Sequence, residues 1–305
     1  MKKNKYKLII LLMIVFLFTG CTEQLKGKDK KPVVNETTGQ SLTKNIICQP
    51  TDEKTIELYK ENGVEIEKLQ KCSSYSLRKG LKEYDGLWST VFVKPLSWFI
   101  LKIGRVVKSN GLSLIIVSIL IRLIAFPITR KTAMQSELIA QAQPELDKLE
   151  KKYADKNDQD SMMKKSQEMA AIYKKYKINP VMGCLFAFIQ LPLFIAFLEA
   201  INRVPAIFEE KFLLFELGIT PATALSHGLY LYLIISILVA ATTFFSMKLN
   251  STANQNNQQV AMMNKIMFGM IVIMSFAMTT ALNIYWVTTN VFTIVQNLLV
   301  KRKKD

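Results

Sequence analysis

An arginine in the middle of an apolar helix is the residue most able to act on another molecule. The run from Leu112 to Ile128 (LSLIIVSILIRLIAFPI) is long enough to cross the hydrocarbon core of a bilayer, and Arg122 is its only charged residue. Such a charge costs a few kcal/mol on insertion scales, so it is tolerated where it faces protein, water or a bound partner. Ser118, Arg122 and Thr129 fall within about 40° on a helical wheel, which predicts a polar stripe. The alternative is snorkelling toward Arg130, about 12 Å away, beyond comfortable reach. We therefore favour a functional cavity arginine.

Two further apolar segments carry polar groups that hydrocarbon cannot satisfy. Gln190 interrupts one of them. The last one, NIYWVTTNVFTIVQNLLV, places four polar side chains within about 60° of one another on the wheel: Trp286, Asn290, Thr293 and Asn297. These groups either bond to one another as interhelical glue or line a hydrated groove. Because they converge with Arg122 from three segments, we favour the groove.

Composition excludes several classes of protein. The chain has 305 residues, of which 50% are hydrophobic, and a formal net charge of +16; its mean hydropathy is +0.18. Long apolar stretches argue against soluble and disordered proteins, and the lysines lie outside those stretches, where membrane topology rather than DNA binding places them. With one histidine, His227, and no glycine-rich phosphate loop, we expect no catalytic residue, no metal and no soluble cofactor.

The first 20 residues predict a signal peptide. Lys2, Lys3, Lys5 and Lys7 form a basic start, and residues 8–18 form an apolar core too short to span a membrane. The ending LFTGC resembles the lipobox of bacterial lipoproteins, which implies a diacylglycerol and an N-acyl chain such as palmitate on Cys21. The alternative is an ordinary signal or an uncleaved anchor with an incidental cysteine.

Residues 21–86 are expected to form an exported, lipid-tethered segment. Within it, residues 22–45 are polar and lysine-rich and predict a flexible tether, while residues 51–82 predict a small helical hairpin. Cys48 and Cys72 either form a disulfide or remain two free thiols. Residues 87–110 mix tryptophan, lysine and aliphatic residues, which favours an amphipathic helix in the outer interface over an imperfect extra span.

Residues 111–300 predict a core of five transmembrane helices. The expected spans are 112–128, 181–201, 227–247, 266–282 and 284–300. An exported N-terminus places the C-terminus in the cytoplasm. The positive-inside rule agrees, because residues 129–180 hold eleven Lys and Arg and the tail 301–305 is basic, whereas residues 203–225 hold only Arg203 and Lys211.

The cytoplasmic region 129–180 predicts a helical hairpin. Pro144 is expected to open its first helix. The two helices share an apolar seam at heptad-like spacing, formed by Leu146, Leu149, Tyr153, Met169, Ile172 and Tyr176. Its lysines are either solvated or in contact with lipid headgroups or ribosomal RNA.

Four segments together resemble the YidC/Oxa family of membrane protein insertases, in its Gram-positive lipoprotein form. They are IRLIAFPITRKTAMQ, QPELDKLEKKY, EMAAIYKKYKINPVMGCLFAFIQLPLFIAFL and NIYWVTTNVFTIVQN, in the family's order over most of residues 88–300. The resemblance implies an all-α polytopic membrane protein whose five spans surround a hydrophilic groove open to the cytoplasm. Arg122, Gln190 and Trp286 match the family's groove residues, and Ser118, Asn290 and Thr293 are expected beside them.

The same resemblance implies a function in the bacterial plasma membrane. Its partners would be nascent membrane proteins and the lipid bilayer, with the Sec translocase and the ribosome as further partners, although the short tail weakens ribosome docking. A small-solute transporter using an intramembrane arginine is the alternative, but the sequence shows no internal repeat. An intramembrane enzyme would need paired aspartates, Ser/His or a metal triad within the spans, and the sequence has none.

Overall fold

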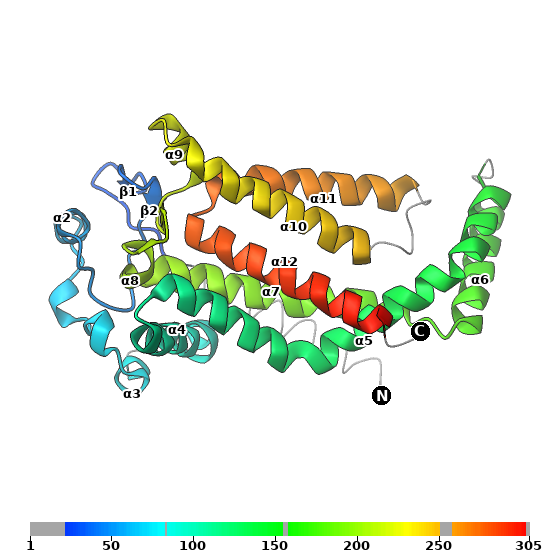
Figure 1. The fold of residues 1–305 in the computed structure, drawn as a ribbon, viewed down its shortest axis with the longest axis horizontal. Coiled ribbons are helices and arrows are strands. Elements are labelled where there is room, and N and C mark those ends of the chain that lie inside the picture. Colours follow the sequence, from blue (N-terminus) through cyan, green and yellow to red (C-terminus); the bar gives the residue numbers. More distant parts are fainter. Residues whose placement is uncertain (1–21, 83, 155–157, 251–257, 303–305) are drawn as a thin grey trace. The chain divides into compact units, whose positions relative to one another are not determined.

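The computed structural model describes residues 22–82, 84–154, 158–250 and 258–302, and helices dominate them (Figure 1). The prediction of a mainly helical protein is confirmed. Contacts divide the chain into two units. The first holds residues up to Val117, Leu191–Ile235 and Phe276–Tyr285, and the second holds Ser118–Gln190, Ser236–Ser275 and the chain from Trp286 onward.

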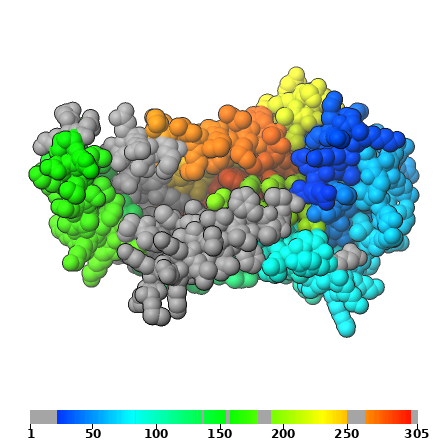
Figure 2. Space-filling model, turned by 180° about the vertical axis from the view of Figure 1, so that it is seen from behind, coloured from blue at the N-terminus to red at the C-terminus, as the bar shows by residue number. Residues whose placement is uncertain are grey.

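Residues 22–82, within the first unit, have an apolar core of their own. Strands β1 (Val34–Asn35) and β2 (Gln40–Ser41) pair antiparallel, with Val34 opposite Ser41. Figure 2 shows these residues as adjoining blue and cyan surfaces. The core residues are Leu25, Leu42, Ile46, Tyr59 and Ile66. The prediction of a flexible tether over residues 22–45 is therefore wrong, because the few leucines of that polar stretch are buried against Tyr59.

Residues 48–82 form short helical turns instead of the expected helical hairpin. Helix α2 (Glu53–Glu61) begins at Asp52, whose carboxylate accepts a hydrogen bond from the Thr55 amide at 2.9 Å. The 3-10 turns η1 (Ile66–Lys68) and η2 (Cys72–Ser74) follow, and then the single helical turn α3 (Leu77–Gly80). Cys48 and Cys72 are joined by a disulfide. A cross-link of this kind stabilises a segment whose apolar core is small.

The expected interfacial helix begins with a π-helical turn. Helix η3 (Ser89–Val93) leads directly into α4 (Lys94–Val107), which ends at Lys108 in the left-handed region (φ 56°). Leu96, Ile100 and Leu101 of α4 are buried, whereas Lys102 and Arg105 of the same helix are exposed. The helix is thus amphipathic, with one apolar face used in protein packing. Its placement in the outer interface stays a prediction.

Five short elements of the first unit lie between two of the long helices in the sequence. These connecting elements are α8 (Pro205–Phe208), β3 (Lys211–Phe212), β4 (Phe215–Glu216), α9 (Pro221–Ser226) and η4 (Tyr230–Tyr232). Strands β3 and β4 pair antiparallel. Tyr232 of η4 connects two of these elements, because its ring packs edge-on against Phe215 of β4 and its hydroxyl accepts a hydrogen bond from the Glu216 amide at 2.8 Å.

The second unit contains the predicted cytoplasmic hairpin. Its two arms are the C-terminal part of α5 (Asn110–Lys152) and α6 (Gln159–Lys175), which lie side by side in Figure 1. Leu146 packs with Met169, Ile172 and Tyr176 as the seam predicted. Ion pairs join the arms in antiparallel order: Glu145 with Lys175, Glu150 with Lys165, and Lys152 with Glu168.

Pro144 does not open a helix, contrary to the prediction, because α5 continues through it. A proline inside a helix removes one backbone hydrogen bond and bends the helix, but it ends the helix only where packing allows. Here Ala142 and Leu146, on either side of the proline, are both buried in one cluster with Ile178. Tertiary packing therefore keeps the helix intact.

The expected spans fall on the long helices with shifted ends. They correspond to α5, α7 (Pro180–Arg203), α10 (Leu233–Asn250), α11 (Gln258–Ala277) and α12 (Thr280–Arg302). The break between the last two lies at residues 278–279 and not near 283. In the described part of the chain, Asn110–Lys152 and Tyr230–Leu249 are long and apolar enough to cross a membrane, and Asn264–Ala277 is a shorter apolar helix. Five crossings remain a prediction.

Candidate functional site

Arg122 and Gln190 meet within the second unit, as their common polarity suggested. Arg122 belongs to α5, and its side chain is 6% exposed. Its guanidinium donates a hydrogen bond to the side-chain oxygen of Gln190 in α7 at 2.7 Å. Because Gln190 is neutral, this hydrogen bond orients the guanidinium without cancelling its charge.

Trp286 and Asn290 of α12 meet at one hydroxyl of α10. The indole N–H of Trp286 donates to Thr243 Oγ1 at 3.1 Å, and the side-chain amide of Asn290 donates to the same oxygen at 2.9 Å. The two donors are one helical turn apart, so they reach a single acceptor from the same face of α12. The sequence predicted both donors as site residues but did not predict Thr243. Two threonines are adjacent there, at positions 242 and 243, and nothing in the sequence distinguished one from the other.

Other polar residues of this unit are buried as well. Ser118 is 1% exposed and Thr293 is 8% exposed, and the Thr293 hydroxyl donates to the backbone oxygen of Thr289 at 2.8 Å. Thr129, part of the predicted stripe, donates to the side-chain oxygen of Gln296 at 3.1 Å. These bonds agree in part with the glue interpretation, since several polar groups satisfy one another.

The helices of the second unit bury polar side chains and expose apolar ones. Leu123 and Ile124, next to Arg122, are 52% and 78% exposed. In α10, Ile237 and Phe245 are exposed, whereas Thr243 is buried. A protein surrounded by water has the opposite arrangement, because exposing large apolar side chains to water is unfavourable. An apolar solvent around these helices explains both observations.

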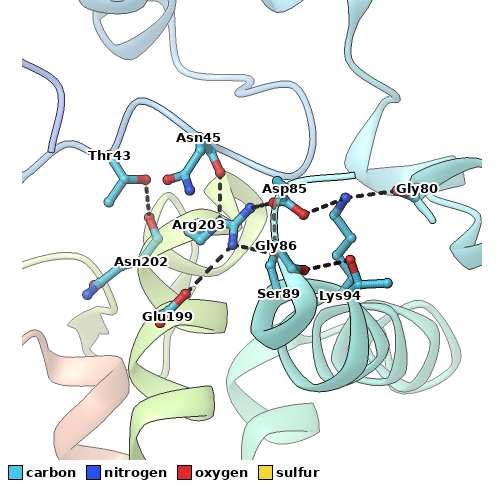
Figure 3. A network of polar contacts seen from close by, with 11 residues as sticks. Thr43, Asn45, Gly80, Asp85, Gly86, Ser89, Lys94, Glu199, Asn202 and Arg203 are labelled. Carbon is cyan, nitrogen blue, oxygen red and sulfur yellow. Dashed lines mark hydrogen bonds and ion pairs between the residues drawn. The ribbon is translucent and has the colours of Figure 1, made fainter. Parts of the chain in front are cut away.

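A second buried arginine, in the first unit, was not recognised as a site from the sequence. Arg203, at the end of α7, is 2% exposed (Figure 3). Its guanidinium pairs with Asp85, donates to Ser89 Oγ at 2.7 Å and to the Asn45 backbone oxygen at 2.7 Å, and lies 3.7 Å from Glu199. The i, i+4 spacing of Glu199 and Arg203 was visible in the sequence, but Asp85 is 118 residues away.

Asp85 is shared between Arg203 and a buried lysine. Lys94 is 4% exposed, forms an ion pair with Asp85 at 2.8 Å and donates to the Gly80 backbone oxygen at 3.0 Å (Figure 3). Burial raises the pKa of the Asp85 carboxyl, but hydrogen bonds from Lys94 and Arg203 outweigh it and hold the pKa below its usual value. The carboxylate is therefore ionised at neutral pH and fastens the loop around it to α4 and α7. This network is a structural clamp.

Cys21 and the signal peptide fall outside the described residues, so the lipid anchor stays a prediction. Among the described residues, no group of three or more His, Cys, Asp and Glu side chains could hold a metal ion.

Comparison with known proteins identifies the family. The family model described as 60Kd inner membrane protein matches residues 102–305. The membrane protein insertase MisCA of Bacillus subtilis is 39% identical over 216 residues, which cover 70% of this chain and 79% of the relative. The membrane protein insertase YidC of Oceanobacillus iheyensis is 36% identical over 226 residues, covering 72% and 85%. These matches confirm the resemblance, and the chain belongs to the 60Kd inner membrane protein family, the YidC/Oxa family.

Proposed function

We propose that this protein inserts integral membrane proteins into the bacterial plasma membrane and assists their folding there. Its relatives are named membrane protein insertases. The observation that carries the proposal is Arg122, a charged side chain that is 6% exposed in a helix whose adjacent Leu123 and Ile124 face outward. The comparisons give no support to a small-solute transporter.

The proposed architecture has five spans around a groove open to the cytoplasm. The described helices α5, α7, α10, α11 and α12 correspond to these spans. Lysines and arginines of residues 129–180 hold that region in the cytoplasm, and the N-terminus lies outside, anchored by lipid on Cys21. The buried polar groups of α5, α7, α10 and α12 support a polar interior.

The proposed mechanism uses the charge of Arg122 and forms or breaks no covalent bond. A client segment that must cross the membrane often carries acidic residues, and moving a carboxylate out of water is costly. A positive charge held within the membrane attracts the carboxylate and offsets part of that cost. The client's apolar helix then leaves sideways into lipid, because burial of apolar surface favours that state.

Partners beyond the client and the bilayer belong to the same proposal. The chain would act alone or beside the Sec translocase, and it would receive clients from the ribosome. The hairpin supports the ribosome contact, since α6 ends in the exposed lysines Lys174 and Lys175 and presents charged faces to solvent.

Insertion into liposomes by purified variants tests the proposal. Arg122→Ala should impair clients with acidic translocated segments, while Arg122→Lys should retain much of the activity because it keeps a point charge. Arg130→Ala is the matched control, since Arg130 is exposed on the same helix and its loss changes net charge equally. Equal insertion of every acidic client by wild type and Arg122→Ala would rule out the groove-charge mechanism.

A further inference from the structure

A cavity in the first unit lies where α4 ends and α5 begins. Its volume is about 500 Å³, and its wall includes the ends of both helices and part of the disulfide-bonded exported segment. Three basic side chains line it: Lys71, Arg105 and Lys108. None of them belongs to the Arg122 site or to the Arg203 clamp, so neither of those features explains why three cations gather here.

Arg105 is held in place and retains donors for a ligand. Its Nε donates to the Leu101 backbone oxygen at 3.3 Å, and its two terminal nitrogens donate to the backbone oxygens of Ser73 and Tyr75 at 3.3 and 3.4 Å. A guanidinium has five N–H donors, so these contacts leave two for a ligand. The side chain is therefore positioned before any ligand arrives.

The two lysines bring charge that the cavity wall does not neutralise. Both are exposed, and in the described part of the chain no carboxylate lies within 4.0 Å of Lys71 or Lys108. Lys108 also has a left-handed backbone conformation, which is uncommon for residues other than glycine.

The one carboxylate of the wall is already committed to the start of α5. The oxygens of Glu210 accept from the Asn110 amide at 2.7 and 2.9 Å, from the Ser109 hydroxyl at 2.8 Å and from the Gly111 amide at 3.3 Å. A carboxylate in this position caps the helix and complements its dipole. Glu210 is thereby directed toward the helix end, and the basic side chains are left to act on the cavity.

The cavity adjoins the apolar part of a helix that is long enough to cross a membrane. Asn110 lines the cavity and is the first residue of α5. Leu112, two residues later, is already 39% exposed, and Val106 at the end of α4 is 78% exposed. A phosphate bound in the cavity could therefore be attached to acyl chains that run along these apolar side chains.

We propose that this cavity binds the phosphate of an anionic glycerophospholipid headgroup from the outer leaflet. Arg105 supplies directed hydrogen bonds to the phosphate oxygens, as guanidinium groups do well, and Lys71 and Lys108 supply point charges. The polar groups of Gln49 and Ser109 in the wall suit the hydroxyls of a glycerol headgroup. The choice of the outer leaflet rests on the orientation given under the proposed function, whereas binding at the cavity does not depend on insertase activity.

Native mass spectrometry of the full-length protein in detergent, titrated with phosphatidylglycerol or phosphatidylcholine of equal chain length, tests the site. Wild type should retain phosphatidylglycerol in preference. The variant Lys71→Gln/Lys108→Gln should lose about fivefold in affinity for each lysine removed. Both residues are exposed, so folding should be unaffected. The control Lys82→Gln/Lys102→Gln removes the same charge from exposed lysines outside the cavity and should bind as wild type does.

Three outcomes would overturn the proposal. Equal loss in both double variants would mean that net charge alone attracts the lipid. Equal retention of the two lipids by wild type would mean that the cavity does not select an anion. Soluble glycerol phosphate, added without lipid, should bind far more weakly than phosphatidylglycerol. Equal affinity would show that the acyl chains contribute nothing and that the lipid is not the source of the phosphate.

Discussion

Replacing Gln190 by glutamate should neutralise the charge of Arg122 without removing the side chain. In the protein the Gln190 side-chain oxygen accepts from Arg122 at 2.7 Å. Gln190→Glu has the same size and can keep that hydrogen bond, but it places a negative charge beside the guanidinium. Arg122 then meets an internal carboxylate before any client arrives. If its charge attracts clients, their acidic residues should lose that attraction.

Two energies set the size of the effect: the attraction between unlike charges and the net contribution of a hydrogen bond to a charged group. Two unit charges at about 4 Å attract by about 4 kcal/mol at an effective dielectric constant of 20. A client carboxylate that reaches Arg122 gains an attraction of this order, less the cost of leaving water. Hydrogen bonds to charged groups contribute about 1.5–3 kcal/mol net. Loss of that contribution corresponds to roughly 10- to 150-fold weaker engagement of an acidic client.

Insertion into proteoliposomes measures this loss. Two clients should be compared, one with an acidic residue in its translocated segment and one with asparagine in its place. Gln190→Glu should impair the acidic client about as strongly as Arg122→Ala does and leave the neutral client unchanged. Gln190→Met, which removes the acceptor but adds no charge, is the matched control and should support both clients. If Gln190→Glu handles the acidic client as wild type does while Arg122→Ala fails, the charge argument is refuted; equal loss of both clients would indicate a structural defect instead.

Further predictions concern the anchor, the hairpin and the exported segment. Cys21→Ala should block lipid labelling and signal removal, leaving the precursor mass in mass spectrometry; normal processing would contradict the lipobox interpretation. Amide exchange across the hairpin should be faster than in the spans. Lysine partners hold the pKa of Glu145 and Glu168 below the usual value, so their stabilisation is present at neutral pH and is lost as pH falls through the depressed pKa. The protection factors of α6, which correct for the intrinsic pH dependence of amide exchange, should therefore fall below about pH 4 and stay constant between pH 8 and 6. Replacing Cys48 and Cys72 by alanine should destabilise residues 22–82 by about 3 kcal/mol, seen as faster proteolysis of that segment, whereas unchanged proteolysis would show that its apolar core suffices.

Local periodicity predicted the hairpin seam and the helices well. Leu146, Met169 and Ile172 pack as their spacing required, because that signal lies within single helices. The sequence also predicted that Arg122 and Gln190 face a common interior, although it did not predict the hydrogen bond between them. A polar side chain in an apolar helix needs a hydrogen-bond partner, and a polar side chain on a neighbouring helix of the same bundle can provide it.

Long-range packing could not be predicted in the same way. The stretch around Leu25 and Leu42 has too few apolar residues to indicate a core. It folds because Tyr59 adds apolar surface for the two leucines to pack against and the disulfide cross-links the segment. The prediction that a helix begins at Pro144 failed for a similar reason. Burial of the residues beside the proline outweighs its local preference to end or begin a helix. In each case contacts distant in sequence decide the conformation.

The contacts that the structure shows for the two buried arginines suggest different roles for them. Arg203 lies between two carboxylates, Asp85 and Glu199, and also donates to a hydroxyl and a backbone oxygen. Its charge is compensated within the fold, which suits a clamp. One partner of Arg122 is the neutral side-chain amide of Gln190, and that hydrogen bond fixes the direction of the guanidinium without neutralising it. A charge that is oriented but not cancelled by this partner can still act on an acidic residue that comes from outside the chain. That is the property an intramembrane receiver for acidic client segments requires, and it is why the two arginines, both buried, have different proposed roles.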